Sequence, residues 1–486
     1  MNKSHQPPSL RQSVVIALLV AGAFFMEQLD GTVIATALPQ MAQSFGVAPV
    51  DLNIGMSAYL LTVAVFIPAS GWVTDRFGAR SVFASAILTF TAASVLCAAS
   101  PTLWTFTAAR VLQGVGGAMM VPVGRLIVLR NTEKQHFVRM IAYLTWPALA
   151  APVIGPPLGG LITTYASWPW IFLLNIPLGI AGLALAVVLI PNSKGERKGA
   201  FDWNGFALTG FASFSLMYSL EAIGRSTVDW FVTAPLFAAG ATSAVVALRH
   251  ALHAPHPLLD LRAFKVPSFA VTVGGGMLFR IAISAVPFLL PLMFQVGFGL
   301  NPLDAGLLVL AVFAGNLGMK PGTGFVLGRL GFRRTLIWNG WLGIASVLAC
   351  GLLTASTPAT VIVAVLFLSG LTRSMEFTTI NALSFCDLDH TRMSGANTLF
   401  SMLQQMGNAV GVAGGAILLR AAAVVMHPDD AAVTVTDFHA AFWGIGLAGA
   451  LGVWHFRRLA PDAGAALKAK SDPGREEDLE RGKVKT

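Results

Sequence analysis

The chain has 486 residues, of which 55% are hydrophobic and only 11% are charged. A soluble protein carries about 25% charged residues, so this composition excludes an ordinary soluble protein, and it equally excludes a disordered chain. A mean hydropathy of +0.70 is typical of a polytopic membrane protein, in which lipid covers the apolar side chains. The net charge of +9 does not indicate a nucleic-acid partner, because the basic residues are scattered between apolar runs.

Fourteen apolar runs follow one another along the chain, and each is near the ~20 residues that a helix needs to cross a bilayer. They cover residues 13–37, 51–73, 81–100, 103–129, 138–163, 169–191, 203–222, 229–249, 268–296, 303–327, 333–354, 357–384, 396–420 and 437–457. The sequence therefore predicts an all-α integral membrane protein with fourteen spans.

The positions of lysine and arginine predict how these spans are oriented. Most of the 32 basic residues fall in segments on the side of the N-terminus, whereas only Arg225 and Arg420 fall in loops on the other side. The positive-inside rule then places both termini in the cytoplasm. A cleaved signal peptide is the alternative interpretation of the first run, but Glu27 and Asp30 within that run argue against it.

An internal repeat predicts how the spans are grouped. Residues 45–80 align without a gap on residues 298–333, at a fixed offset of 253 residues. The shared residues include the pairs Gly46/Gly299, Asp51/Asp304, Pro68/Pro321, Gly71/Gly324, Gly78/Gly331 and Arg80/Arg333. Such a repeat is typical of two parallel bundles related by an axis along the membrane normal. Spans 1 to 6 and 9 to 14 are then two six-helix bundles, and spans 7 and 8 are an inserted pair.

The expected domain boundaries follow from this grouping. They are a cytoplasmic N-terminal segment at 1–12, an N-terminal bundle at 13–191, a linker with the inserted pair at 192–250, a C-terminal bundle at 251–457 and a disordered cytoplasmic tail at 458–486. Since the interior of the inserted pair holds no ionisable residue, we expect the pair to be peripheral.

Three motifs resemble those of a known family. The loop after span 2, Gly71-Trp-Val-Thr-Asp75-Arg76-Phe-Gly78-Ala-Arg80, resembles the signature loop of the major facilitator superfamily. Span 5 carries Gly155-Pro156-Pro-Leu-Gly159-Gly160, which resembles the antiporter motif of that superfamily. Span 1 carries Leu29-Asp30-Gly-Thr32, which is similar to the 14-span drug:proton antiporters of the EmrB and QacA type. Arg280, Lys320 and the stretch 374–388 look closest to the branch of bacterial multidrug exporters of the MdtD and HsrA type.

The resemblance implies a major facilitator fold, with two pseudo-symmetric bundles that rock about a central site. It also implies proton-coupled export of amphipathic drug-like compounds across the bacterial inner membrane, by a monomer without a cofactor. Its partners would be the small-molecule substrate, protons and the bilayer. One alternative is an exporter of a specific metabolite or lipid, and another is a membrane sensor or scaffold that does not transport.

Signatures of other chemistry are weak or absent in the sequence. The chain has no GxxxxGK[ST], HExxH or GxSxG motif, so neither ATP-driven transport nor an enzyme of these classes is indicated. His250, His253 and His256 cluster in a predicted cytoplasmic loop but lack acidic or cysteine partners. We therefore predict no metal site.

The signature loop and the antiporter motif each have a physical interpretation. Gly71 and Gly78 permit close helix approach and a tight turn, while Asp75 can cap a helix or pair with Arg76 or Arg80. We expect this loop to act as a conformational latch, with an ordinary basic turn as the alternative. The glycines and prolines of span 5 predict a thin, kinked helix, with an ordinary packing helix as the alternative. Its motif residues are Gly155, Pro156, Gly159 and Gly160.

Ionisable residues at membrane depth must pair or line a wet cavity. They are Glu27, Asp30, Arg110, Arg280, Lys320, Arg373 and Glu376. Asp30 and Arg110 each lie ~11 Å below the same membrane face, so they can meet, and Glu27 is one turn deeper. A buried acid beside an arginine can couple transport to protons, although a permanent salt bridge between the two spans is the alternative.

The C-terminal bundle carries its own charges. Lys320 and Glu376 lie at similar depth, so we expect Glu376 to be neutralised by Lys320 or by Arg373. Glu27 corresponds to Arg280 by the repeat, so the two bundles present opposite charges to one cavity. Candidate residues for the substrate cavity are Phe24, Phe25, Gln113, Met119, Met120, Phe279 and Met293.

Overall fold

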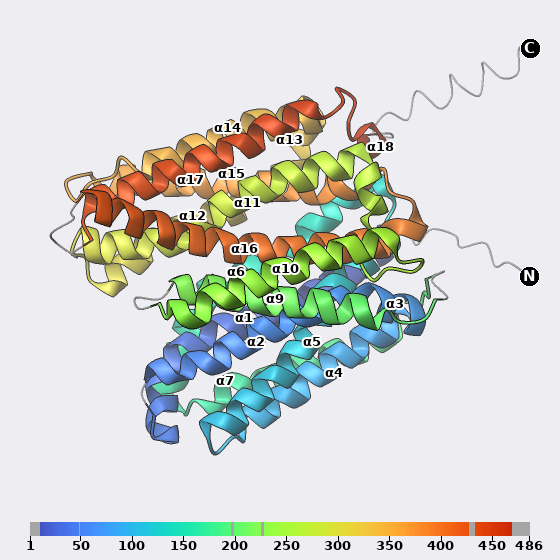
Figure 1. The fold of residues 1–486 in the computed structure, drawn as a ribbon, viewed down its shortest axis with the longest axis horizontal. Coiled ribbons are helices and arrows are strands. Elements are labelled where there is room, and N and C mark those ends of the chain that lie inside the picture. Colours follow the sequence, from blue (N-terminus) through green and yellow to red (C-terminus); the bar gives the residue numbers. More distant parts are fainter. Residues whose placement is uncertain (1–9, 48, 196–198, 225–227, 427–432, 469–486) are drawn as a thin grey trace, which may run out of the picture.

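A computed structural model describes residues 10–47, 49–195, 199–224, 228–426 and 433–468. Its described residues form helices and connecting turns (Figure 1). Several predictions lie outside the described residues, namely those for segment 1–9, Arg225 and most of the predicted tail, from residue 469 onward.

The N-terminal half forms one group of helices. They are α1 (Leu10–Phe45), α2 (Asn53–Phe66), α3 (Ser70–Phe77), α4 (Ala79–Ala98), α5 (Leu103–Arg130), α6 (Phe137–Tyr165), α7 (Pro169–Leu173) and α8 (Asn175–Leu189). Short 3-10 turns lie at Pro49–Leu52, Ile67–Ala69 and Lys134–His136. Within the group, α1 packs on α6 and α5 packs on both α2 and α4.

The C-terminal half forms the second group, after the pair α9 (Trp203–Gly224) and α10 (Trp230–His253). Its helices are α11 (Pro267–Leu292), α12 (Pro302–Gly318), α13 (Thr323–Leu330), α14 (Phe332–Cys350), α15 (Ala359–Cys386), α16 (His390–Met426), α17 (Val435–His455) and the short α18 (Ala465–Lys468). Irregular turns lie at Leu261–Lys265, Met293–Gly297 and Phe456–Arg458. In this group α11 packs on α16 and α17, and α12 packs on α15.

Helix is present at all fourteen predicted spans. Eleven of the described helical segments are long and apolar enough to cross a membrane, or twelve when the bent pair α12 and α13 counts as one span. The other two predicted spans contain α14 and α17, whose ends carry polar residues such as Arg333, Arg334 and Asp437. The helices are thus compatible with fourteen spans, a number that remains a prediction.

The backbone reproduces the internal repeat. Gly46 and Gly299 both have positive φ, at 66° and 70°, and Gly78 and Gly331 have φ of 93° and 78°. A left-handed backbone favours glycine because other residues would be strained there. Near the proline pair of the repeat, α2 gives way to α3 through a 3-10 turn, and α12 and α13 are bent by 60°. The repeat therefore preserves both the turns and the break in the second span of each bundle.

The inserted pair lies against both groups. In Figure 1, α9 and α10 run between the N-terminal half and the C-terminal half, and α9 contacts both α2 and α16. Glu221 of α9 accepts a hydrogen bond from Ser57 of α2, and Arg420 of α16 donates to the carbonyl oxygen of Ile223 at 3.0 Å. α9 therefore lies along the seam between the bundles, while α10 packs on α9.

The two bundles are joined near α3. The hydroxyl of Ser394 donates to the carbonyl oxygen of Gly71 at 3.2 Å, and the amide of Asn397 donates to that of Pro122 at 2.7 Å. A buried apolar cluster, which includes Leu126, Phe137 and Phe385, also joins residues of α5, α6, α15 and α16. The N-terminal end of α1 and the C-terminal end of α17 both lie on this side of the molecule (Figure 1). By the positive-inside prediction, this closed end is the cytoplasmic one.

Candidate functional site

The centre of the N-terminal bundle is an ion pair between Asp30 and Arg110. A guanidinium nitrogen of Arg110 lies 2.7 Å from the Asp30 carboxylate, and each residue is 2% exposed. The contact predicted from equal depth along α1 and α5 is confirmed. Burial of both partners makes the pair sensitive to removal of either one, because the other charge would then be orphaned.

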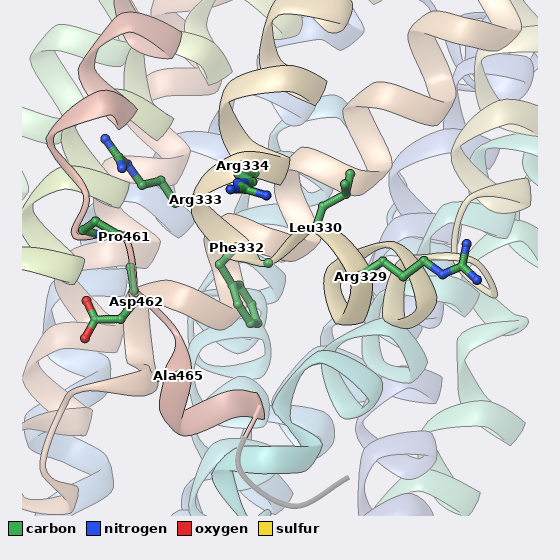
Figure 2. A pocket seen from close by; sticks show the side chains of 10 residues that line it. Arg329, Leu330, Phe332, Arg333, Arg334, Pro461, Asp462 and Ala465 are labelled. Atoms are coloured by element: carbon green, nitrogen blue, oxygen red, sulfur yellow. The ribbon is translucent and has the colours of Figure 1, made fainter. Parts of the chain in front are cut away.

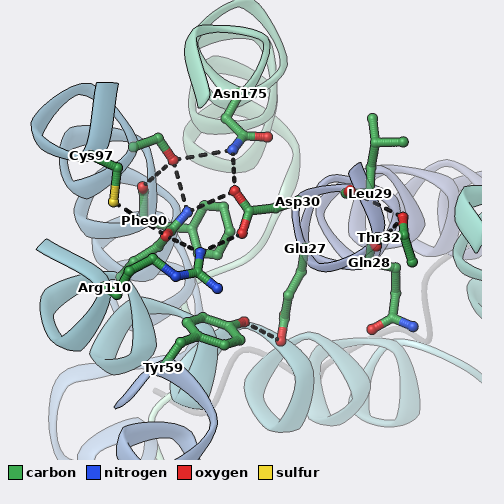
Figure 3. A network of polar contacts seen from close by, with 12 residues as sticks. Glu27, Gln28, Leu29, Asp30, Thr32, Tyr59, Phe90, Cys97, Arg110 and Asn175 are labelled. Carbon is green, nitrogen blue, oxygen red and sulfur yellow. Dashed lines mark hydrogen bonds and ion pairs between the residues drawn. The ribbon is translucent and has the colours of Figure 1, made fainter. Parts of the chain in front are cut away.

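Neutral donors complete the shell around Asp30. Gln113 of α5 and Asn175 of α8 donate to one carboxylate oxygen at 3.0 and 2.9 Å (Figure 3). Both amides also donate to the hydroxyl of Ser94 on α4. Asp30 therefore accepts three hydrogen bonds, one from a charged group, and four helices contribute to the network. This arrangement stabilises the ionised carboxylate.

Glycines let α5 approach its neighbours closely enough to build this network. A Cβ on Gly114 would collide with Thr62 and the carbonyl oxygen of Tyr59, both on α2. One on Gly116 would collide with the backbone of α4 at Phe90. Arg110 also stacks on the Tyr59 ring, with 4.4 Å between its guanidinium carbon and the ring centroid.

Glu27 occupies a different environment from Asp30, one turn away on α1. One of its carboxylate oxygens accepts a hydrogen bond from the Tyr59 hydroxyl at 3.1 Å (Figure 3). The other oxygen is buried without a hydrogen-bond partner among the described residues. Glu27 thus has one neutral donor where Asp30 has three donors. It can gain or lose a proton without breaking an ion pair.

The signature loop connects α3 to α5 and α8. Asp75 pairs with Arg130 at the end of α5, at 2.9 Å. The sequence-based expectation that Asp75 pairs with Arg76 or Arg80 is wrong, because Arg76 is exposed and Arg80 donates to the carbonyl oxygen of Val187. Gly71 lies against α16, where an added Cβ would collide with Thr398. The loop therefore contacts the opposite bundle through Gly71.

The span 5 motif packs α6 closely on α1. An added Cβ on Gly155 would collide with Thr32, and one on Gly159 would collide with Thr36 and the carbonyl oxygen of Val33. Gly160 has open space around it, and Pro156 is exposed on the face away from α1. The glycines at 155 and 159 are thus the contact positions, and α6 continues as one helix through all four of its prolines.

The charges of the C-terminal bundle do not pair as expected. Lys320 donates to the Thr378 hydroxyl at 2.8 Å, and Glu376 accepts from the Asn339 amide at 2.7 Å. The second oxygen of Glu376 is buried without a hydrogen-bond partner among the described residues. The expected neutralisation of Glu376 by Lys320 or Arg373 is therefore wrong in this structure. Lys320 and Glu376 face different neighbours, namely Thr378 and Asn339.

Arg280 and Arg373 share an aromatic partner. Their guanidinium carbons lie 4.2 and 5.5 Å from the centroid of the Phe377 ring. Glu27 and Arg280, which correspond by the repeat, are not brought together, since Glu27 contacts Tyr59. The two bundles do carry opposite charges at these positions.

Arg125, near the end of the predicted span 103–129, is a buried charge that was not among the candidate site residues. It lies inside α5, is 7% exposed, and donates to Ser401 and Gln404 of α16 at 3.3 and 3.0 Å. It also lies over the Phe400 ring. The signal in the sequence was the apolar stretch 126–129, which follows Arg125 and continues the helix. Tyr59 and Asn175 were also absent from the candidate site residues.

The proposed cavity residues are mostly packed inside the bundles. Phe24 and Met120 belong to one buried cluster and Phe279 and Met293 to another. Phe25 and Met119 lie at the edges of such clusters, and Gln113 belongs to the Asp30 network. In this structure these side chains serve packing or the polar network.

Three hollows lie away from the Asp30 network. A cavity of 1090 Å³ lies between α2, α5 and α9, and one of 580 Å³ lies between α6 and α13 and includes Lys320. The third, of 360 Å³, lies at the turn between α13 and α14, beside Pro461 and Asp462 (Figure 2). Arg329, Arg333 and Arg334 make this third pocket basic.

The chain is similar to known transport proteins over most of its length. The profile of the Major Facilitator Superfamily matches residues 20–412. A protein of Escherichia coli K12 named "Putative multidrug resistance protein MdtD" is 37% identical over 445 residues, which are 91% of this chain and 94% of that protein. The protein of the same name from Shigella boydii serotype 18 has the same identity and coverage.

Solved structures show the same fold at low identity. The proton:xylose symporter XylE superposes with a TM-score of 0.64 at 13% identity, over 93% of this chain and 96% of that one. The human organic anion transporter MFSD10 superposes with a TM-score of 0.62 at 14% identity, over 93% of this chain and 100% of that one. With the family profile and the close relatives, these likenesses show that the chain belongs to the major facilitator superfamily and is a multi-pass membrane transporter.

Proposed function

We propose that the protein exports amphipathic drug-like compounds in exchange for protons. The observation that carries this proposal is the pair of buried acids on α1, with Asp30 in contact with Arg110 at 2.7 Å and Glu27 nearby with one neutral donor. A driving proton needs a buried group whose charge can change during the cycle. The names of the relatives support multidrug export as the activity.

The two acids have different roles in this proposal. Glu27 exchanges the proton, because protonation there disturbs only the hydrogen bond from Tyr59. Asp30 holds Arg110 and Gln113 in place while it is ionised, and its own protonation would release Arg110. A change at either acid thereby alters how α1 packs on α5, and this packing is the link between proton binding and bundle motion.

Alternating access provides the transport cycle. The contacts of α16 with α3 and α5 close the predicted cytoplasmic end, which is the arrangement expected of an outward-facing state. Rocking of the bundles would break these contacts and open that end. We also propose the bacterial inner membrane as the location, cytoplasmic termini, a monomeric state, and transport without enzymatic activity.

The test is transport by purified protein in proteoliposomes under an imposed pH gradient. We expect uphill movement of at least one amphipathic fluorescent compound from a panel that differs in charge, coupled to proton flux of opposite direction. Glu27→Gln should insert and fold normally yet lose uphill transport. Asp30→Asn should lose it as well and should also lower the melting temperature, because it removes the partner of Arg110.

Three outcomes would contradict parts of this proposal. Uphill transport by normally folded Glu27→Gln would remove Glu27 from proton exchange and leave Asp30 as the carrier. Full uphill transport by both single variants would exclude both acids. A folded wild-type protein that moves neither dye nor protons with any tested compound would favour a sensor or scaffold.

A further inference from the structure

A short stretch of α15 collects three basic side chains. Arg280 of α11 and Arg373 of α15 both lie over the Phe377 ring, and Lys320 donates to Thr378. A fourth cation is close to this group, because Arg125 donates to Gln404 of α16, about one turn before Gly407, which faces the Arg280 side chain. The cluster therefore consists of Arg125, Arg280 and Arg373, and Lys320 lies beside it, on the residue that follows Phe377.

Helix α16 lines the same cluster from another side. Arg125 contacts Ser401 and Gln404, and a Cβ added to Gly407 would lie 3.4 Å from the Arg280 side chain. Among the described residues, these cations contact hydroxyls, an amide and aromatic rings, all of them neutral. Arg125 reaches across from the N-terminal bundle, so the cluster lies where the two bundles meet.

The nearby carboxylates make their hydrogen bonds with other residues, and one oxygen of Glu27 and one of Glu376 have no partner among the described residues. Asp30 pairs with Arg110, Glu27 accepts from Tyr59, and Glu376 turns toward Asn339 of α14. Among the described residues, none of the four cations has an ion pair with a carboxylate within 4.0 Å. Arginine keeps its charge in proteins, so the cluster needs an anion from outside the chain.

We propose that this cluster binds the carboxylate of an amphipathic organic anion, which makes organic anions the substrate class of the transporter. The planar guanidinium groups of Arg280 and Arg373 suit bidentate contacts with a carboxylate. Phe377 and Phe400 provide aromatic surface for the apolar part. The same charges repel organic cations. This inference rests on the proposed export function and narrows it.

The 580 Å³ cavity between α6 and α13 supports the same charge preference. Lys320 lines it together with His136 and Arg139, and no acidic residue is among the residues that line it in the described part of the chain. Lys320 links the basic lining of this cavity to Thr378, the residue that follows Phe377.

The experiment measures binding to the purified full-length protein in nanodiscs of phosphatidylcholine. The probes share one ring system and differ in charge: naphthalene-2-carboxylate, the neutral 2-naphthalenemethanol and (2-naphthylmethyl)trimethylammonium. We expect the carboxylate to bind and raise the melting temperature, and the ammonium compound not to do so. Arg280→Gln and Arg373→Gln should each weaken carboxylate binding at least tenfold, whereas Arg280→Lys should weaken it less.

Arg329→Gln is the matched control. Arg329 also lies over an aromatic ring, Phe325, at 4.5 Å, but it is exposed. Its substitution should leave carboxylate binding unchanged. Carboxylate binding that is insensitive to both Arg280→Gln and Arg373→Gln in folded protein would overturn the proposal, as would equal binding of the ammonium compound. The Arg280→Lys variant keeps the test valid if the glutamine variants fail to fold.

Two further results separate this inference from others. If anionic phosphatidylglycerol in the nanodisc abolished carboxylate binding, the site would belong to a lipid headgroup and the proposal would be overturned. If ethidium were exchanged for protons while naphthalene-2-carboxylate did not bind, the result would support the export function and contradict the anion site. Arginine-dependent carboxylate binding without proton-coupled flux would support the site and contradict the proposed coupling.

Discussion

At the scale of single residues, two acids one turn apart on α1 have different surroundings. Asp30 is satisfied by Arg110, Gln113 and Asn175, whereas Glu27 has Tyr59 as its donor. Charge and hydrogen bonding in a buried site decide whether a carboxylate stays ionised. Asp30 is therefore fixed by an ion pair and two amide donors, whereas Glu27 has one donor and an oxygen without a partner among the described residues.

Removal of one member of the ion pair should cost more than removal of both. Arg110→Leu leaves the Asp30 carboxylate buried with neutral donors, so we expect a loss of roughly 3–5 kcal/mol in stability. The double variant Asp30→Asn with Arg110→Leu leaves no buried charge and should recover part of this loss. Melting temperatures in one detergent measure both variants. A double variant less stable than Arg110→Leu would contradict the account.

The sequence predicts how deep each of these residues lies in the membrane, but not which neighbouring helix its side chain faces. Asp30 and Arg110 were predicted to meet because both lie at one level, and they do meet. The same reasoning failed for Lys320 and Glu376, because Glu376 turns to α14 and Lys320 to Thr378. The face of a wholly apolar helix is not marked by hydrophobic periodicity, so only packing decides which neighbour a charge meets.

At the scale of elements, glycine spacing explains how α6 lies on α1. Gly155 and Gly159 are one turn apart and both face α1, where threonine side chains and a carbonyl oxygen occupy the space. Small residues at this spacing let two helix backbones approach closely in a membrane. The motif alone predicted a thin helix, but not that α1 would be its partner.

Adjacent glycines of α6 should respond differently to the same change. Gly159→Ala introduces a methyl group against Val33 and Thr36, so we expect a loss of about 1–3 kcal/mol from overpacking. Gly160→Ala is the matched control, because its Cβ would meet open space. Melting temperature and membrane abundance of both variants check this. If Gly159→Ala and Gly160→Ala lowered the stability equally, the contact with α1 would not be the reason for glycine at position 159.

The entry to the inserted pair depends on Asp202, which precedes α9. Its carboxylate accepts hydrogen bonds from the backbone of Gly205 and Leu258 and from the ring of His250. Partial burial by itself raises the pKa of Asp202, but these hydrogen bonds outweigh burial and hold the pKa below its ordinary value of 3.8. A lowered pKa means that the ionised form is the one that stabilises the folded state.

The contribution of Asp202 should therefore be present above its unfolded pKa and be lost as the pH falls through the folded value. We expect wild type to melt above Asp202→Asn near pH 7, and the difference to shrink below about pH 4. Melting curves of both proteins between pH 3 and pH 7 provide the measurement. A difference that stays constant over that range would exclude the carboxylate charge as its cause.

At the scale of the whole molecule, the repeat predicted the fold and the structure shows where the two halves differ. The paired glycines with positive φ and the broken second span of each bundle were encoded in residues 45–80 and 298–333. The contacts between the two bundles were not encoded in this repeat, because they depend on side chains from distant helices. Arg125 and the position of α9 against α2 and α16 are two examples.

The last prediction concerns the closed end, where the repeat is asymmetric. Gly71 and Gly324 are equivalent by sequence, yet a Cβ on Gly71 would collide with Thr398 of α16, while one on Gly324 would meet open space. Gly71→Ala should therefore push α3 away from α16 and favour opening of the predicted cytoplasmic end, whereas Gly324→Ala should not. Spin labels placed on both bundles at that end would measure the distance between them. We expect a longer distance population for Gly71→Ala alone, and unchanged distances in a folded Gly71→Ala protein would show that this contact does not hold the bundles together.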